Sequence, residues 1–536
     1  MIRYLKSIWQ KVRGLAKEAW QLRFLSLLAG LTGPCLFLVC TPHDYHTLHW
    51  VSFLPLFFAC QQSSWKQNFY LGWCGGLASN CLIFSWIFLT ITSYGQLPAL
   101  LTYPVGALAL LAMASWGAVL YGFLGVLLPL TRRHFPKLWI LLVPSAFSFL
   151  EFYFPNIFPY FQGCGQFTNL PLLQLASVTG VTGITFLVLE GNCILFEGIL
   201  QIRKKNWKWI GFILIGWILP LFLVMQWGKQ RVQNYDDALK QTPHIKVAMV
   251  QTGWTIQKAF ETRLGETLRF YQTQSSIALK NGAKLIIWPE SSMSVNTRSP
   301  IFQQLHDFLL QWVQKEQFQL IYGGNASSQN ADFLNTAYYI NPQGTQKNYS
   351  KMTLVPFGEY TPFVSLIPAL KGKLSRGVQL AAGEKRELFQ LDYGKNQTFP
   401  FAMAICYEAI FHRKIWQCVQ DGARLIVNVT VDAWFLGTNE HTQHLMLASI
   451  GTVQLGVGLL RSVDSGITAY IDPVGRIHNP TPILKQALWE GEVPLGDLDT
   501  PIRRYGFWFP WLCFMLSVIA FLYRYFTLKY TKSGSK

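Results

Sequence analysis

Residues 399–408 read Phe-Pro-Phe-Ala-Met-Ala-Ile-Cys-Tyr-Glu, an apolar run that ends at Cys406. Residues 399–405 form a short run typical of a buried strand, and residues 408–420 follow as a helix. A strand-to-helix junction exposes its side chain and offers the first N–H groups of the helix to an oxyanion. The stretch therefore predicts α/β layers with Cys406 at a strand end.

The same alternation of strands and helices extends through residues 229–505. A hairpin is expected over 334–350, about the turn Asn341-Pro342-Gln343-Gly344. Outside the hairpin, the expected strands of the block are 244–251, 284–288, 319–322, 399–405, 424–429, 459–463 and 466–472. The expected helices are 257–280, 299–315, 408–420 and 440–456. Helices between strands predict layered α/β packing for this block.

Two more strand ends carry reactive groups. Glu290 follows the apolar strand 284–288 and Pro289, and Lys351 comes just after the hairpin. A carboxylate can take the proton of a thiol, and a lysine that stays charged can stabilise a tetrahedral oxyanion. Each residue alone also fits a structural role, as a core cysteine, a helix cap or a solvated lysine. The spacing of the three residues along the chain does not show whether they meet in the folded protein.

The rest of the chain has the composition of a membrane protein. Charged residues make up 13% of the 536 residues and apolar residues 51%, whereas soluble domains carry about a quarter charged residues. Apolar runs long enough to approach a bilayer span lie near 22–41, 48–64, 68–92, 97–130, 138–155, 172–200, 207–228 and 506–527. We expect about eight spans, seven of them before the α/β block.

Basic residues predict the orientation of these spans. The eighteen Lys and Arg outside residues 229–505 lie in the two tails and in alternate loops, and the intervening loops carry none. Positive loops stay on the cytoplasmic side. We expect a cytoplasmic tail over 1–21 that is either an interfacial helix or a solvated basic segment, spans within 22–228, a globular domain over 229–505 on the opposite side of the membrane, a last span over 506–527 and a cytoplasmic tail over 528–536.

The same distribution argues against a nucleic-acid partner. Formal net charge is +18, but residues 229–505 hold 27 basic and 22 acidic residues. Most of the excess charge therefore lies beside the bilayer. Glu151, Glu190 and Glu197 lie in or near the spans, where a carboxylate is either functional or placed at a helix end.

Several motifs resemble one known family. The three strand-end segments are similar to the Glu-Lys-Cys triad of the nitrilase (carbon–nitrogen hydrolase) superfamily, whose fold is an αββα sandwich. A closer resemblance is to the bacterial apolipoprotein N-acyltransferases, which carry such a domain between membrane spans. The matching stretches are 354–363 (Leu-Val-Pro-Phe-Gly-Glu-Tyr-Thr-Pro-Phe), 405–408 (Ile-Cys-Tyr-Glu), 432–435 (Asp-Ala-Trp-Phe), 460–462 with 466–469, 158–160 and 180–183.

The resemblance implies roles for three catalytic residues. Glu290 would be the general base, Lys351 the oxyanion stabiliser and Cys406 the nucleophile.

The resemblance also implies supporting residues. Glu359 would position Lys351 or share its proton, and Tyr407 and Glu408 would shape the pocket beside the nucleophile. Trp434 lies in a matching motif. The chain departs from the family where Phe260 replaces a tryptophan and where Gln454 replaces a glutamate.

The implied reaction is the maturation of lipoproteins in a bacterial inner membrane, with residues 229–505 as a catalytic domain on the periplasmic side. Cys406 would take an acyl chain from a phospholipid donor as a thioester and pass it to the N-terminal amine of a diacylated lipoprotein. Residues 362–374 are apolar with lysines at their end, which fits either an arm dipping into the bilayer interface or a packed loop.

Two other functions stay open. A membrane-tethered amidase or nitrilase would use water in place of the amine, and an inactive hydrolase-like domain would make a membrane binding protein. No cofactor is expected. No metal is expected either, because His441 and His444 at helical spacing lack an evident third ligand.

Overall fold

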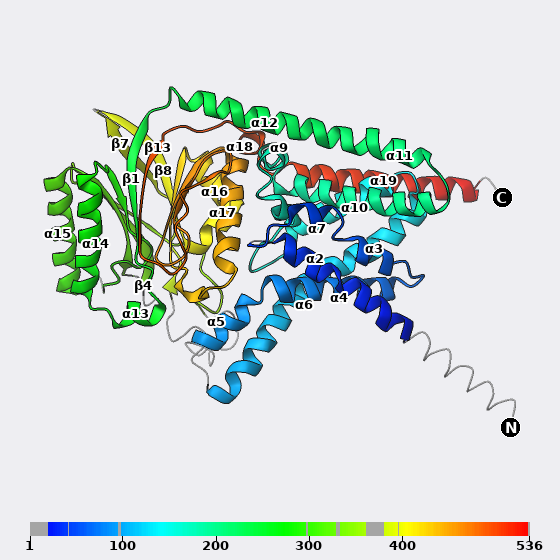
Figure 1. Cartoon of the computed structure of the whole chain (residues 1–536), viewed down its shortest axis with the longest axis horizontal. Coiled ribbons are helices and arrows are strands. Elements are labelled where there is room, and N and C mark those ends of the chain that lie inside the picture. The colour runs from blue at the N-terminus through cyan, green and yellow to red at the C-terminus, as the bar shows by residue number, and fades with distance from the viewer. Residues whose placement is uncertain are drawn as a thin grey trace.

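A computed structural model describes residues 20–40, 42–94, 98–295, 299–327, 333–360, 380–394 and 396–533. Its α/β part contains two β-sheets (Figure 1). The first has the order β13-β1-β2-β3-β4-β5, with β6 paired to β4, and the second has the order β12-β11-β10-β9-β8-β7. Strands β1, β2 and β3 are mutually parallel, as are β8, β9 and β10.

The strands of the first sheet are β1 (His244–Gln251), β2 (Leu285–Ile287), β3 (Gln319–Ala326), β4 (Phe333–Ile340), β5 (Gln346–Ser350), β6 (Leu380–Ala381) and β13 (Ala487–Pro494). Those of the second are β7 (Leu388–Gly394), β8 (Gln397–Ile405), β9 (Leu425–Thr430), β10 (Gly458–Val463), β11 (Ala469–Ile471) and β12 (Ile477–His478).

Side-chain alternation along the strands builds a layered core. One face of β1 packs Val247 and Met249 against the second sheet, and the other packs Ala248 and Val250 against helices. Helices α14 (Leu264–Lys280) and α15 (Pro300–Glu316) cover the first sheet, and α16 (His412–Gln420) and α17 (Glu440–Leu455) cover the second (Figure 1). This is the αββα sandwich expected from the sequence, and the fold class is confirmed.

Some elements differ from expectation. The helix expected over 257–280 is two helices, α13 (Ile256–Glu261) and α14, with Thr262 extended between them. Strands β6, β7 and β13 were not expected. In β13 the sequence Ala-Leu-Trp-Glu-Gly-Glu-Val-Pro has no long apolar run, because this strand pairs with only one neighbour, β1, at the edge of its sheet.

The membrane part is helical. Its helices include α2 (Thr32–Val39), α3 (Leu54–Ala59), α4 (Trp65–Ile83), α5 (Trp86–Tyr94), α6 (Ala99–His134), α7 (Trp139–Tyr153), α8 (Leu170–Leu173), α9 (Ala176–Thr179), α10 (Val181–Arg203), α11 (Lys208–Ile213), the π-helical η3 (Leu214–Ile218), α12 (Leu219–Leu239), α18 (Pro501–Tyr505) and α19 (Phe509–Ser533). Among the described residues, five helices are long and apolar enough to cross a bilayer, or six if the bent pair α4 and α5 is one span.

Three expected spans differ in length or bounds from the helices of the structure, although α10 within the third is itself long enough to cross a bilayer. Residues 48–64 form the short helices η1 (His46–Trp50) and α3, since Pro55 starts α3 and Cys60 already ends it. Helix α7 has 15 residues, and Gly180, at φ +71°, separates α9 from α10 within 172–200. The total of eight spans therefore stays a prediction. Helix α12 continues past residue 228 to Leu239 as one helix.

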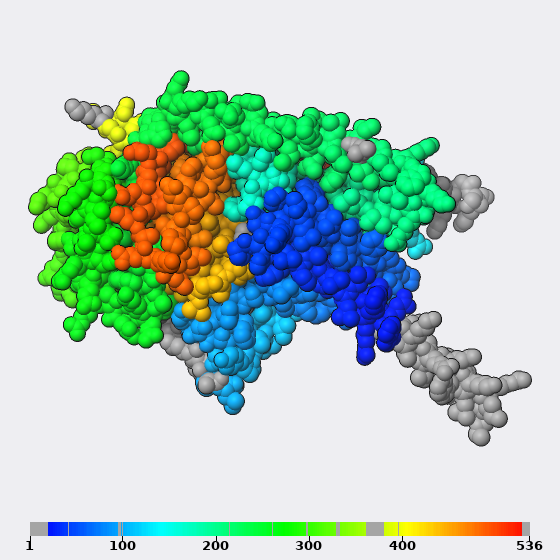
Figure 2. All heavy atoms as spheres, in the orientation of Figure 1, coloured from blue at the N-terminus to red at the C-terminus, as the bar shows by residue number. Residues whose placement is uncertain are grey.

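The membrane helices and the sandwich share one core. In α17 every residue but Thr442 is buried, because one face packs on the second sheet and the other on the membrane helices. Met446 and Ile450 belong to the same apolar cluster as Val181 and Ile184 of α10. The space-filling view shows no gap between the two parts on the face that it presents (Figure 2). The second sheet therefore lies nearer the membrane helices than the first.

Candidate active site

Glu290 lies just beyond the carboxyl end of β2 and is buried, with 7% of its surface exposed. One carboxylate oxygen accepts a hydrogen bond from Asn335 Nδ2 at 2.6 Å, and the other accepts one from the backbone N–H of Val431 at 2.8 Å. Burial raises the pKa of Glu290, while Lys351 lowers it and Glu359 raises it. The carboxylate is therefore fixed in position and more basic than an exposed glutamate.

Lys351 lies just after β5 and has 1% of its surface exposed. Its ammonium group is 2.7 Å from Glu359 Oε1 and 3.6 Å from Glu290 Oε1. Burial lowers the pKa of Lys351, but the two carboxylates outweigh this effect and the pKa is raised overall. Glu359 is itself held by the N–H of Val355 at 2.8 Å. Lys351 is thus a fixed cation between two carboxylates.

Cys406 lies at the carboxyl end of β8, as expected, with a left-handed φ of +52°. This sparsely populated conformation sharply turns the chain from β8 into the short helix η5 (Cys406–Ile410). Burial raises the pKa of the thiol well above its usual range, Glu290 raises it further and Lys351 lowers it. Both charged groups therefore lie within electrostatic range of the sulfur.

Glu408 ties the cysteine loop to the lysine loop. Its carboxylate accepts hydrogen bonds from the backbone N–H groups of Ile405, Met352 and Thr353 at 2.7–2.9 Å, and from the hydroxyl of Tyr349 at 2.9 Å. Its burial, at 3% exposed, raises its pKa, while these donors lower it. The side chain holds the positions of Lys351 and Cys406 relative to each other.

Tyr407 joins the cysteine loop to the membrane part. Its hydroxyl donates to the carbonyl of Ile157, in the loop after α7, and its ring meets Phe158 and Phe411 edge-on at 5.5 and 4.7 Å. The loop is anchored in turn by Glu151, which accepts from the N–H of Gln162 at 2.6 Å. The cysteine therefore lies against the membrane helices.

Two family descriptions match consecutive parts of this chain. Residues 32–194 match the apolipoprotein N-acyltransferase N-terminal domain, and residues 246–500 match the carbon-nitrogen hydrolase family. The apolipoprotein N-acyltransferase of Geobacter metallireducens is 30% identical over 511 residues, which cover 91% of this chain and 92% of that protein. This chain belongs to the apolipoprotein N-acyltransferase family. The relative from Haemophilus ducreyi is 28% identical and covers 81% of this chain and 83% of its own.

Solved structures of the nitrilase superfamily are also similar to part of this chain. An amidase from Nesterenkonia AN1 aligns with 47% of the chain and 92% of its own length, at 16% identity and a TM-score of 0.37.

Trp434 lies beside the membrane part of the acyltransferase chain. It belongs to η6 (Ala433–Phe435), its backbone carbonyl accepts from Thr90 Oγ1 at 3.4 Å, and its ring meets Tyr94 of α5 edge-on at 5.6 Å. Phe260 is in α13, and its side chain is outside the described residues, as are residues 362–374, the expected interfacial arm. The roles of Phe260 and of the arm therefore stay predictions.

Gln454, a departure from the family pattern, is a buried link between α17 and α10. Its carbonyl oxygen accepts from the N–H of Val181 at 2.9 Å, and its amide nitrogen lies 2.6 Å from His412 Nδ1. His412 Nε2 lies 2.6 Å from the carbonyl of Leu447, so Nε2 carries the proton and Nδ1 accepts. A glutamine supplies the donor and the acceptor that this position needs.

Several residues near the candidate site were not predicted to take part in it. Asn335 holds Glu290, and Asn428 donates to the carbonyl of Cys406 at 3.3 Å. His444 Nε2 lies 3.4 Å from the same carbonyl, while its Nδ1 lies 3.1 Å from Asp432. Arg461 is fully buried and bridges Asp432 and Asn428. The hints in the sequence were the matching stretches 432–435 and 460–462, which contain Asp432 and Arg461, and His444 on the expected helix 440–456.

Asp432, Glu440 and His444 have ligand atoms within 4.8 Å of one another and could hold a cation. Arg461 Nη2, at 2.7 Å from Asp432, already supplies positive charge at this point. Among the causes that act on Asp432, burial raises its pKa, but Arg461 and His444 outweigh it and hold the pKa well below its usual range. The expectation of no metal stays a prediction.

Proposed function

We propose that this chain N-acylates apolipoproteins, taking the acyl chain from a phospholipid through a thioester on Cys406. The acceptor is the N-terminal amine of a diacylglyceryl-cysteine. The observation that carries the proposal is the position of Cys406: Tyr407, the next residue, donates to Ile157 of the membrane part. A lipid substrate that stays in the bilayer needs a nucleophile at this boundary.

The first half-reaction makes the thioester. Cys406 Sγ bonds to the ester carbonyl carbon of the phospholipid as its proton passes to Glu290. Lys351 stabilises the negative oxygen of the tetrahedral intermediate. The ester C–O bond then breaks, and Glu290 returns the proton to the leaving oxygen of the lysophospholipid.

The second half-reaction transfers the acyl group. The lipoprotein amine bonds to the thioester carbon and gives a proton to Glu290. Lys351 again stabilises the oxyanion. The C–S bond breaks, the amide leaves, and the sulfur of Cys406 recovers the proton from Glu290. The raised pKa of the thiol supports proton transfer during attack rather than a stored thiolate.

The last helix supports a periplasmic site. Helix α19 points away from the sheets (Figure 1), and the sequence from its last turns to the end of the chain holds Lys529, Lys532 and Lys536. We infer that both termini are cytoplasmic, that the sandwich faces the periplasm, and that the protein resides in the inner membrane of a bacterium.

The test is to trap the thioester. Full-length protein incubated with phospholipid and no amine should gain the mass of one acyl group, and hydroxylamine should remove it. Adding a diacylated lipopeptide should discharge the adduct and yield a triacylated peptide. Cys406→Ala should form no adduct.

Cys418→Ala is the matched control, because Cys418 is the other free cysteine of the α/β part. That variant should keep the adduct and the activity. An adduct that survives in Cys406→Ala would contradict the proposal. Discharge to fatty acid alone, with the lipopeptide unmodified, would indicate a hydrolase instead.

A further inference from the structure

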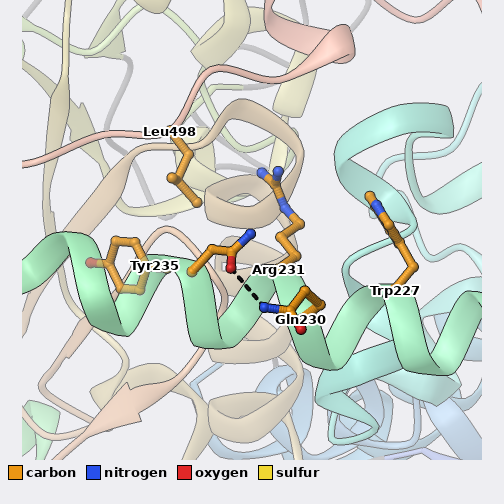
Figure 3. A pocket seen from close by; sticks show the side chains of 6 residues that line it. Trp227, Gln230, Arg231, Tyr235 and Leu498 are labelled. Atoms are coloured by element: carbon orange, nitrogen blue, oxygen red, sulfur yellow. Dashed lines mark hydrogen bonds between the residues drawn. The ribbon is translucent and has the colours of Figure 1, made fainter.

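A small cavity lies between α12 and the segment before α18. Its volume is about 210 Å³, and it is lined by Trp227, Gln230, Arg231, Asn234, Tyr235 and Leu498 (Figure 3). Pockets for whole drug-sized ligands measure about 300–1,000 Å³. This cavity therefore has room for a headgroup fragment rather than for an entire lipid.

Arg231 points from α12 into this cavity (Figure 3). Its Nε and Nη2 atoms are buried and make no hydrogen bond to any described residue. A buried donor without an acceptor costs about 1–3 kcal/mol, and more when the group is charged. The guanidinium thus lacks a counter-group that such a position normally requires.

The nearby carboxylates are occupied by other cations. Asp236 and Asp237, on the same helix, pair with Arg476 and with Lys240. Asp497, beside Leu498, accepts from both Arg424 and Arg503. Within the described part of the chain, no carboxylate pairs with Arg231. Its guanidinium faces the cavity, and an anion from outside the protein would supply the missing counter-charge.

The depth of the cavity fits the headgroup layer of a bilayer. Gly228 packs against the carbonyl of Pro171, in α8, directly after the loop that is expected on the outer side, and Arg231 lies three residues further, about 4.5 Å along the axis. Leu498 precedes α18, which leads into the last span, α19. Trp227 is 41% exposed on the rim, as aromatic side chains at a membrane interface often are.

We propose that this cavity binds the phosphate group of a membrane lipid headgroup, with Arg231 as its charged anchor. The planar guanidinium matches a phosphate with two parallel hydrogen bonds. The amides of Gln230 and Asn234, which bond each other at 2.8 Å, lie beside it for the polar part of the headgroup. The site is separate from Cys406 and does not depend on the proposed acyl transfer.

Native mass spectrometry of the full-length chain tests the site. In a Cys406→Ala background, which prevents turnover, delipidated protein is titrated with phosphatidylglycerol. Arg231→Met should weaken the binding of phosphatidylglycerol by about tenfold or more, the equivalent of about 1.4 kcal/mol. Lys229→Met, which removes a neighbouring exposed cation, should bind phosphatidylglycerol as tightly as the parent. Equal lipid retention in the two variants would overturn the proposal.

Two probes separate the possible sources of phosphate. Diacylglycerol with the same chains lacks the phosphate and should not be retained through Arg231. Inorganic phosphate supplies the anion without the lipid and should not displace phosphatidylglycerol at equal concentration. Retention of diacylglycerol, or displacement by inorganic phosphate, would overturn the assignment to a lipid headgroup.

Thermal unfolding without lipid distinguishes binding from a structural role. In lipid-free detergent Arg231→Met should unfold at or above the temperature of the parent, because an unpaired charge has been removed. Phosphatidylglycerol should raise the unfolding temperature of the parent and of Lys229→Met more than that of Arg231→Met. A lower unfolding temperature for lipid-free Arg231→Met would mean that Arg231 already has a partner within the fold, and would refute the site.

Discussion

At the residue scale, two carboxylates compete for one lysine. Lys351 is nearer to Glu359, at 2.7 Å, than to Glu290, at 3.6 Å. Glu290 accepts from Asn335 and Val431 instead, so it is held without being fully neutralised. This division leaves Glu290 free to take a proton while Lys351 keeps its charge.

Glu290→Gln should lower kcat/KM of N-acylation by about 10²–10⁴-fold, the usual range for losing a general base. The amide keeps the size of the side chain but cannot accept a proton. The measurement is steady-state transfer to a diacylated lipopeptide. Unchanged kcat/KM would remove Glu290 from the mechanism.

The pH profile of the parent enzyme should reflect the same residue. Burial raises the pKa of Glu290 above its usual value. The base works only when deprotonated, so activity should fall as pH drops through this raised pKa. Lys351, with a raised pKa, should stay charged throughout the neutral range. An acidic limb at the pKa of an ordinary glutamate would contradict the assignment.

Glu359→Gln should lower kcat with little change in KM, because it loosens Lys351 without removing it. We expect a loss of about tenfold or more, since a hydrogen bond to a charged group contributes about 1.5–3 kcal/mol. Glu387→Gln is the control: Glu387 also lies 2.7 Å from a lysine, but Lys385 is 81% exposed. An equal effect of both variants would exclude a specific role for Glu359.

At the element scale, α17 joins the sandwich to the membrane helices. Gln454, near its end, bonds both α10 and His412. Burial lowers the pKa of His412 to about 4, so its ring is neutral near pH 7. The link therefore requires an amide that donates to the neutral ring.

Gln454→Glu should destabilise the protein near pH 8, because an ionised carboxylate cannot donate to His412 Nδ1. Protonation of His412 would restore the bond, so the variant should raise the folded-state pKa of His412. A higher folded-state pKa of His412 adds stability at pH values below its unfolded-state pKa of about 6.5. This added stability is lost as pH rises through the folded-state pKa. The gap in unfolding temperature between the variant and the parent should therefore narrow from pH 8 to pH 6. A gap that stays constant would contradict this account.

At the scale of the whole molecule, Cys406, the proposed nucleophile, lies between the sandwich and the membrane helices. Tyr407 and Phe158 connect the cysteine loop to the membrane part, and Trp434 and Tyr94 form a second contact on α5. Aromatic contacts between the two parts hold the site at a fixed depth. Their position favours substrates that remain in the bilayer.

Reporter fusions test the orientation of the whole chain. Green fluorescent protein fused after Lys536 should fluoresce, because that end is expected in the cytoplasm. Alkaline phosphatase fused after Leu239, at the end of α12, should be active, because it folds only in the periplasm. The opposite pair of results would invert the topology and exclude a periplasmic Cys406.

The sequence by itself determined the alternating strands and helices, the apolar helices and the family, because periodicity, hydropathy and motif spacing are local properties. It also indicated Glu290, Lys351 and Cys406 as candidates, since each follows a recognisable strand or hairpin. Only the tertiary structure decided that Lys351 lies between Glu290 and Glu359, that Glu408 joins two loops, and that Gln454 faces His412. Those relations depend on which strand edges and helix ends meet after folding. Contacts between residues far apart in the chain leave no periodic trace along it.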